Sequence, residues 1–312
     1  MHVLDSKIVA ELQKDLRQSN RQLAESLNVD EHTIKKRIEN LVSSGAVVFA
    51  ALPNLKRLGY GTRVFFVLEV LPQKFEQIGK QLCDMPQLGF VSYCAGFTKF
   101  YVRGDFTTIG TIAKFIKDDI GKIQGINTIE LIIELEQLKS MSTELTRKAH
   151  SQSFGTTEYQ TGDIDIGQID RHLIYELQKN ARASLKELAY AVGVSPMTIR
   201  RHIKYLIKNQ TIDFTAIPNT GTLGYPVLSF ARIKTEPTRT GYVAESCVQY
   251  PQVHYVGITA GPTQVLITLH GNSHNEISEF LTRELSKTDG IIAVDSFVFL
   301  EVMKQTFTWI QK

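Results

Sequence analysis

The sequence is poor in cysteine and lacks the motifs that carry bond chemistry. Only Cys83, Cys94 and Cys247 are present, and they form neither a Cys-x-x-Cys pair nor a metal-ligand spacing with any histidine. Phosphate-binding loops, nucleophile elbows and zinc-protease motifs are also missing. We therefore expect no catalytic residue, no metal and no cofactor, and an odd number of cysteines fits a reducing compartment.

Long hydrophobic runs and an excess of one charge are absent as well. The most apolar segment, residues 64–71, contains Glu69 and is far shorter than the roughly 20 residues of a membrane span. The first residues lack the basic and apolar regions of a secretory signal. The formal net charge is only +3, so nucleic-acid affinity would need locally placed charge. These absences predict a cytoplasmic protein without membrane contact.

The sequence contains one pattern of residues that occurs twice. Asp5 recurs as Asp170, and Leu58 of a Leu-Gly-Tyr run recurs as Leu223, a spacing of 165 residues in both cases (170 − 5 and 223 − 58). Solenoid repeats are about 20–50 residues long, whereas a unit of this length is a small domain or a pair of domains. The chain is therefore interpreted as a tandem duplication of one complete unit.

The first third of each copy has the signals of three short helices. In copy two, Ser184 is an N-cap, Gly193 ends the second helix, and Ser195 with Pro196 begins a third. In copy one, Asp30 is the corresponding cap of the third helix. Three helices in this order predict a helix-turn-helix, whose third helix enters the major groove of double-stranded DNA.

The third helices turn small polar and basic residues outward. Ile199, Ile203 and Leu206 follow the i, i+4, i+7 spacing of a buried face. DNA contacts are predicted from the opposite faces, which carry His32, Thr33, Lys35 and Lys36 in copy one and Ser195, Met197, Thr198, Arg200, Arg201 and Lys204 in copy two. The alternatives are a solvated basic face and a three-helix module that binds protein. The agreement of two copies favours DNA.

A β-rich stretch follows each third helix, at residues 46–52 and 211–217, and each is closed by Pro-Asn. Such a stretch suggests a wing hairpin beside the helices. The remainder of each copy alternates in the order βαββαβ, the ferredoxin-like arrangement. We assign residues 1–55 and 168–220 to winged helix-turn-helix domains, residues 56–139 and 221–312 to ferredoxin-like domains, and residues 140–167 to a linker. The predicted fold class is α+β.

An antiparallel sheet with helices on one face leaves its other face free to pair with a second sheet. The linker holds two such sheets at high effective concentration. We therefore expect the two sheet domains to pack together as an intramolecular pseudo-dimer or to swap between chains of a homo-oligomer.

These residues resemble the Lrp/AsnC (feast/famine) family of transcriptional regulators over residues 4–139 and again over residues 168–304. The specific signals are Ile169-Asp170-Arg171, the Gly193-Val194-Ser195-Pro196 turn, and the Leu-Gly-Tyr run before each sheet domain. The resemblance implies a winged helix-turn-helix joined to an αβ-sandwich that dimerises and, in many relatives, binds amino acids or other small metabolites. It implies a sequence-specific DNA-binding regulator with a small-molecule effector.

The chain departs from the family at the turn where the resemblance places the effector. An acid is usual three residues after a glycine there, but Lys99 follows Gly96 and Gln264 follows Gly261. The predicted ligand-binding residues are therefore Gly96, Lys99, Gly261 and Gln264. A lysine favours an anionic effector, such as an organic acid or an acidic amino acid. The alternative is that Lys99 points to solvent and the pocket is vestigial.

Two other functions stay open. Some proteins that resemble this family, including fused double copies, are sirohaem decarboxylases, which carry a His-Asn-Tyr stretch on the second strand of the sheet. Only His254 matches that stretch here. The other alternative is a small-molecule sensor that does not bind DNA.

Overall fold

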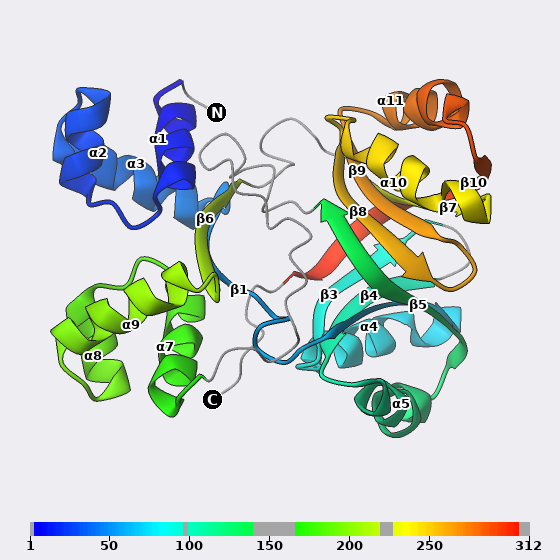
Figure 1. Cartoon of the computed structure of the whole chain (residues 1–312), viewed down its shortest axis with the longest axis horizontal. Helices are drawn as coiled ribbons and strands as arrows, with labels where there is room; N and C mark the ends of the chain where they lie inside the picture. The colour runs from blue at the N-terminus through cyan, green and yellow to red at the C-terminus, as the bar shows by residue number, and fades with distance from the viewer. Residues whose placement is uncertain (1–2, 96–98, 140–165, 219–226, 306–312) are drawn as a thin grey trace.

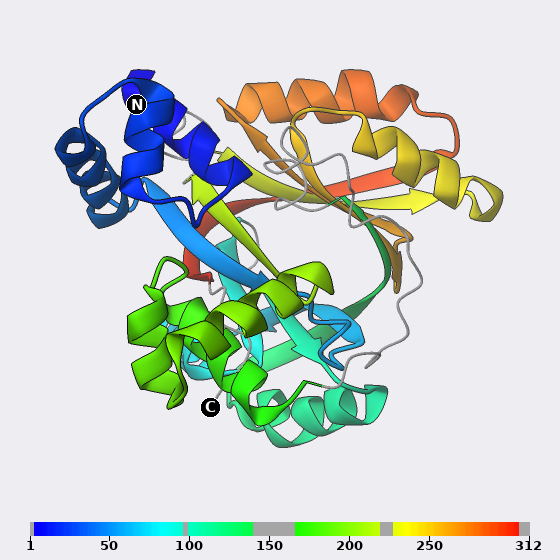
Figure 2. The ribbon, with the colours of Figure 1, turned by 60° about the vertical axis from the view of Figure 1, so that its left-hand side comes forward.

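A computed structural model describes residues 3–95, 99–139, 166–218 and 227–305. Both copies have the same order of elements, with three helices, one strand and then a βαββαβ unit. The two three-helix units lie at one side of the molecule with strands β1 and β6 between them, and the two sheet units lie at the other side (Figures 1 and 2). The duplication read from the sequence is thus a duplication of structure.

The predicted three-helix order is confirmed in both copies. The helices are α1 (Val3–Lys14), α2 (Asn20–Leu27) and α3 (Glu31–Ser43) in copy one, and α7 (Gln168–Lys179), α8 (Leu185–Val192) and α9 (Pro196–Lys208) in copy two. Ser184 caps α8 in a capping box with Glu187, and Gly193 ends it with φ at 79°. Both signals were local in the sequence, which is why they predicted the helix ends correctly.

The expected wing hairpins are not formed by the described residues, so that part of the sequence interpretation is wrong. Each copy supplies one strand, β1 (Val47–Pro53) and β6 (Ile212–Pro218), and the two pair antiparallel with each other from Val47↔Pro218 to Pro53↔Ile212. Each proline stands at the last position of its strand, where a missing N–H costs the ladder least. The strand that completes each wing comes from the other copy, which a hairpin rule cannot predict.

Each sheet domain has the predicted βαββαβ order. Copy one contains β2 (Thr62–Val70), α4 (Phe75–Asp84), β3 (Leu88–Cys94), β4 (Lys99–Phe106), α5 (Ile109–Asp118) and β5 (Ile126–Lys139). Copy two contains β7 (Val227–Thr235), α10 (Thr240–Val248), β8 (Val253–Ala260), β9 (Val265–Gly271), α11 (His274–Glu279) and β10 (Ile291–Gln305). The helices cover the outer face of the strands (Figure 1).

The two sheet domains pack together within one chain, as predicted, but they join by their edges. Strand β5 pairs with β8 and strand β10 pairs with β3, which closes an eight-stranded barrel in the order β10-β3-β4-β2-β5-β8-β9-β7. Closure gives every edge strand a hydrogen-bonding partner. The free faces of the two sheets become the barrel interior.

The barrel interior has an aromatic centre shared by both copies. Tyr101 of copy one stacks on Phe230 of copy two with ring centroids 4.2 Å apart, and Phe65 and Phe299 lie within 5.6 Å of the Tyr101 ring. A separate apolar core joins the two helix-turn-helix units through β1 and β6. Both cores therefore tie copy one to copy two.

Candidate nucleic-acid interface

Helices α3 and α9, the recognition helices, each begin at a side-chain cap. Asp30 Oδ1 accepts the Thr33 N–H at 2.8 Å, and Ser195 Oγ accepts the Thr198 N–H at 3.1 Å. The Thr33 hydroxyl donates to Asp30 Oδ2 at 2.5 Å, and the Thr198 and Ser195 hydroxyls lie 2.9 Å apart. Three of the predicted DNA-contacting residues therefore also hold the start of a recognition helix.

One face of each recognition helix is buried and the other is open. Ile34, Ile38 and Leu41 are buried in α3, and their equivalents Ile199, Ile203 and Leu206 are buried in α9. The other predicted DNA-contacting residues are exposed, namely His32, Lys35 and Lys36 on α3 and Met197, Arg200, Arg201 and Lys204 on α9. The structure thus brings the predicted residues of each copy together on one open helix face.

The two faces differ in how far their charge is neutralised. On α3, Lys35 lies 3.9 Å from Glu39, one helical turn away. On α9, neither Arg200 nor Arg201 forms an ion pair with any residue that the structure describes, and the same holds for Lys204. The outer face of α9 therefore has the higher uncompensated positive charge, which is the property that phosphate binding uses.

Helix α8 adds an exposed tyrosine that the sequence analysis missed. Tyr190 is 93% exposed, the highest value among the large exposed apolar side chains of the described chain. The equivalent residue in copy one is Glu25, which pairs with Arg21 at 2.9 Å. Copy two thus has an exposed aromatic ring at the position where copy one has an ion-paired acid. A position-by-position comparison of the two copies would have identified this tyrosine from the sequence.

An equivalent polar contact fixes each recognition helix to the first helix of its unit. In copy one, Arg37 Nη1 lies 3.3 Å from Asp5 Oδ1. In copy two, the same positions hold His202 and Asp170, with Nδ1 and Oδ1 2.7 Å apart. The contact survives although arginine has been exchanged for histidine, which indicates that its position matters more than one particular cation.

Two equivalent arginines hold the helix-turn-helix units to each other. Arg17 donates to the carbonyls of Ala181 and Ala183 at 2.8 and 2.9 Å, and in return Arg182 donates to the Gln18 carbonyl at 3.0 Å. Arg17 lies over the ring of Phe214 and Arg182 over that of Phe49, its equivalent. Burial lowers the pKa of both arginines. This reciprocal arginine pair, with the β1–β6 ladder, holds the recognition helices in one arrangement.

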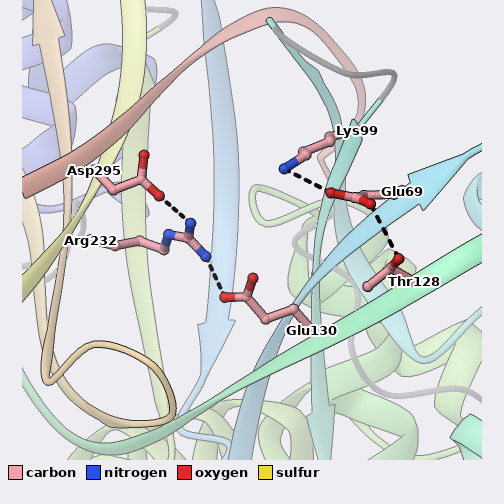
Figure 3. A network of polar contacts seen from close by, with 6 residues as sticks. All are labelled: Glu69, Lys99, Thr128, Glu130, Arg232 and Asp295. Carbon is pink, nitrogen blue, oxygen red and sulfur yellow. Dashed lines mark hydrogen bonds and ion pairs between the residues drawn. The ribbon is translucent and has the colours of Figure 1, made fainter.

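The side chain of the predicted effector residue Lys99 already has partners within the protein. Its Nζ lies 3.0 Å from Glu69 Oε1 and over the ring of Phe297, and the other oxygen of Glu69 accepts from Thr128 (Figure 3). The Lys99 side chain is only 18% exposed, so it does not simply point to solvent. An anion at Lys99 has to compete with Glu69, whose pKa is lowered by the hydrogen bond and charge of Lys99.

Of the other predicted effector residues, Gly96 lies outside the described residues, Gln264 bonds within copy two, and Gly261 meets copy one. Gln264 Oε1 accepts the Thr235 N–H at 3.1 Å. Gly261 has φ at +149°, and a Cβ there would come within 3.0 Å of the Leu131 carbonyl of β5. Only glycine fits this approach of one copy to the other without strain.

A second network missed by the sequence analysis lies near Lys99. Arg232 of β7 binds Glu130 of β5 and Asp295 of β10 (Figure 3). Glu130 and Asp295 occupy equivalent positions in the two copies, whereas the position equivalent to Arg232 holds Val67. One arginine therefore serves two acids related by the duplication, and long-range pairing of this kind left no local signal.

His254, the residue that matches the decarboxylase stretch, lies on β8 beside the buried His270, with ring centroids 4.4 Å apart. The part of the chain that the structure describes contains no group of three or more side chains suited to a metal ion. No helix in that part is long and apolar enough to cross a membrane.

Comparison with known proteins agrees with this geometry. The AsnC-type helix-turn-helix domain matches residues 1–42 and 167–207, and the Lrp/AsnC ligand binding domain matches residues 228–309. The HTH-type transcriptional regulator FL11 of Pyrococcus abyssi is 30% identical over 144 residues, which are 46% of this chain and 95% of that protein. FL11 of Pyrococcus furiosus is 30% identical over 142 residues, 45% of this chain and 93% of that protein.

The chain belongs to the Lrp/AsnC family and carries two units where each of these relatives carries one. Among solved structures, the siroheme decarboxylase NirDL covers 97% of this chain and 93% of its own with a TM-score of 0.65 at 12% identity. Its complex with an iron-uroporphyrin III analogue gives a TM-score of 0.66. At this identity the likeness shows a shared double-unit fold and says nothing about activity.

Proposed function

We propose that the chain is a sequence-specific DNA-binding transcriptional regulator of the Lrp/AsnC type that acts in the cytoplasm. The observation that carries the proposal is the outer face of α9, within an AsnC-type helix-turn-helix. The basic residues on this face form no ion pairs with described residues. Regulators with this fold read base edges from the first turns of the recognition helix and hold the backbone with basic residues. The proposal assigns no catalytic role to the chain.

The two recognition helices predict an asymmetric target. Met197 and Arg200 of α9 stand where α3 has His32 and Lys35. Among the outward positions only Thr33 and Thr198 are the same. A symmetric dimer reads a palindrome because both halves present one surface. Two unlike surfaces held by the arginine pair instead favour a site with unlike halves.

Selection of bound duplexes from a random pool tests both statements. Enrichment of one sequence with unlike half-sites is the expected result. The selected duplex is then compared with two controls in which one half-site is copied over the other, and both controls should bind more weakly. A pool without enrichment argues against DNA binding itself, whereas equal binding of the controls contradicts only the asymmetry.

We also infer a small-molecule effector, an organic acid or an amino acid, because the second half of each unit is of the ligand-binding type. The turns that end at Lys99 and Gln264 remain a proposed location for the effector site, although both side chains have partners within the protein. Association of chains into a homo-oligomer is a further proposal. Light scattering of the purified protein, with and without DNA, measures it directly.

A further inference from the structure

The barrel interior contains a second polar group, at the end opposite to Lys99 along the same strands. Side chains alternate across a strand, so Tyr101, Arg103 and Asp105 of β4 share the inner face. Arg103 pairs in register with Phe65 of β2 and Phe90 of β3, and its guanidinium carbon lies 6.0 Å from the Phe90 ring centroid. These residues enclose Arg103 within the wall of the barrel.

The neighbouring arginine, Arg63, is fully paired. Its Nε donates to Asp105 Oδ1 at 2.8 Å and its Nη1 to Gln137 Oε1 at 3.0 Å, and Glu134 Oε2 lies 3.7 Å from Nη1. The Tyr255 hydroxyl of copy two donates to the same Glu134 oxygen at 2.5 Å. Burial by itself lowers the pKa of Arg63, but the carboxylates of Asp105 and Glu134 outweigh it and raise that pKa. Both acids of the group are therefore used by Arg63.

Arg103 has no such partner. Its side chain forms no hydrogen bond or ion pair with any described residue, and its buried Nε is without an acceptor. Burial lowers the pKa of Arg103 and the charge of Arg63 lowers it further, with Asp105 opposing. Tyr101 lies two residues before Arg103 and Asp105 two residues after it, on the same face of the strand. The Tyr101 hydroxyl and Asp105 Oδ2 are also buried without a hydrogen-bond partner. An enclosed guanidinium without a hydrogen-bond acceptor, beside two buried polar atoms that also lack partners, is costly and calls for a bound counter-group.

We propose that Arg103, Tyr101 and Asp105 form a binding site for a small carboxylate that carries a hydrogen-bond donor on the adjacent carbon. One guanidinium without a hydrogen-bonded counter-ion matches one carboxylate, which it can hold through two parallel N–H···O bonds. The Tyr101 hydroxyl donates to the same ligand group. Asp105 Oδ2 accepts from the hydroxyl or ammonium group next to the carboxylate. The four charges of Arg63, Arg103, Asp105 and Glu134 cancel, which disfavours ligands with more than one net negative charge.

The site occurs once in each chain. The positions equivalent to Arg103 and Asp105 are Thr268 and His270 in copy two, and the position equivalent to Arg63 is Leu228. Copy two therefore lacks every charged member of the group. A ligand should bind with a stoichiometry of one per chain. Its binding is measured without DNA, so failure of this site leaves the proposed DNA binding untouched.

Four probes of nearly the same size test the chemistry by calorimetry and by thermal shift. Lactate and alanine have the carboxylate and a donor, propionate has no donor, and lactamide has no anion. At equal ionic strength, lactate, alanine or both should bind at one site per chain and raise Tm by about 2 °C or more. Propionate and lactamide should bind at least tenfold more weakly. No shift with lactate or alanine, or equal binding of propionate, overturns the proposal.

Variants of Arg103 separate a ligand site from a structural arginine. Arg103→Gln should abolish binding of the active probe, whereas Arg283→Gln, at an arginine of the other copy whose side chain is 74% exposed, should leave it unchanged. Arg103→Leu should raise the Tm of the ligand-free protein, because it removes a guanidinium that is enclosed without a hydrogen-bond acceptor. Binding that survives Arg103→Gln, or a lower Tm in Arg103→Leu, contradicts the proposed site.

Discussion

The two copies share one fold but distribute charge differently. The recognition helix of copy one carries Lys35 paired with Glu39, whereas α9 of copy two carries basic residues without ion pairs among the described residues. In the barrel the asymmetry is reversed, because the Arg63 and Arg103 group belongs to copy one and its equivalents in copy two are Leu228 and Thr268. The recognition-helix face with unpaired basic residues and the proposed ligand site therefore lie in different copies.

Covalent duplication explains why such a division is available. In a homodimer every substitution appears on both sides of the two-fold axis. Here Arg232 binds Glu130 and Asp295 together, and its equivalent position is free to hold the apolar Val67. Contacts that hold the copies together, such as the Arg17 and Arg182 pair, have kept the same residue in both. The arginine contact between the helix-turn-helix units is thus the same in both copies, whereas the Arg232 contact and the outer faces of the recognition helices differ.

The barrel centre gives the largest expected difference in stability. Phe230 is fully buried and its ring contacts Tyr101, Phe297 and Phe299 with centroids 4.2 to 5.4 Å away, whereas Phe65 contacts Tyr101 and Tyr255 at 5.6 and 5.7 Å. Phe230→Ala should lower the free energy of unfolding by about 3–5 kcal/mol, and Phe65→Ala by less. Urea denaturation measures both. A larger loss for Phe65→Ala would show that the centre belongs to copy one.

DNA affinity should reveal the next largest difference. Reversing Arg200 and Arg201 to Glu should weaken binding roughly 100-fold or more and flatten the log–log salt dependence by about two, since each lost phosphate contact contributes about one. Reversing Lys35 and Lys36 in the same way should cost less, because Lys35 already lies beside Glu39. Titrations of the selected duplex at several salt concentrations measure both slopes. Equal losses in the two double variants count against the ranking of the copies.

The reciprocal arginines should behave alike, in contrast to the recognition helices. Arg17→Ala and Arg182→Ala each remove partly buried charged hydrogen bonds and a ring contact, so each should lower the free energy of unfolding by about 2 kcal/mol. Lysine at either position cannot reproduce the paired carbonyl contacts of Arg17 and should recover only part of the loss. A double-mutant cycle with both arginines measures their coupling. If one variant is silent, the pair does not act reciprocally.

The helix caps should give the smallest effects, and only one of them should depend on pH. Ser195→Ala should cost about 1 kcal/mol at any pH. Hydrogen bonds from Thr33 lower the pKa of Asp30 in the folded protein, so its stabilising contribution is present above the unfolded-state value near 4 and is lost as pH falls through the lower folded-state value. Denaturation of Asp30→Ser and of the parent chain at pH 7 and pH 3 tests this. A parent that keeps its advantage at pH 3 would contradict the sign.

Local signals in the sequence predicted the helices and strands well. Caps such as Ser184 and Asp30, the stop at Gly193 and the apolar spacing of α9 each act within a few residues, so reading them needs no knowledge of the rest of the chain. The spacing between Asp5 and Asp170 showed the duplication in the same way. These features also placed the predicted DNA-contacting residues on one helix face.

Predictions that depended on distant partners were incomplete. Lys99 was identified by its position in a family turn, but only the folded barrel shows that Glu69 neutralises it. The wing was expected as a hairpin because each β-rich stretch is followed by Pro-Asn, yet β1 found its partner in β6. The residues of a strand do not specify locally which other strand will supply its backbone hydrogen bonds.

By itself the sequence determined the order of elements, their ends and the existence of two equivalent units, because propensity, capping and periodicity are properties of neighbouring residues. The tertiary structure alone decided that the edges of two sheets meet to close one barrel, and that Arg63 takes both nearby carboxylates while Arg103 receives none. Those outcomes depend on which residues the fold brings together, and even Arg63 and Asp105 lie 42 positions apart along the chain. The physical reason is that a charge acts over a few ångströms of space, whatever its distance along the sequence.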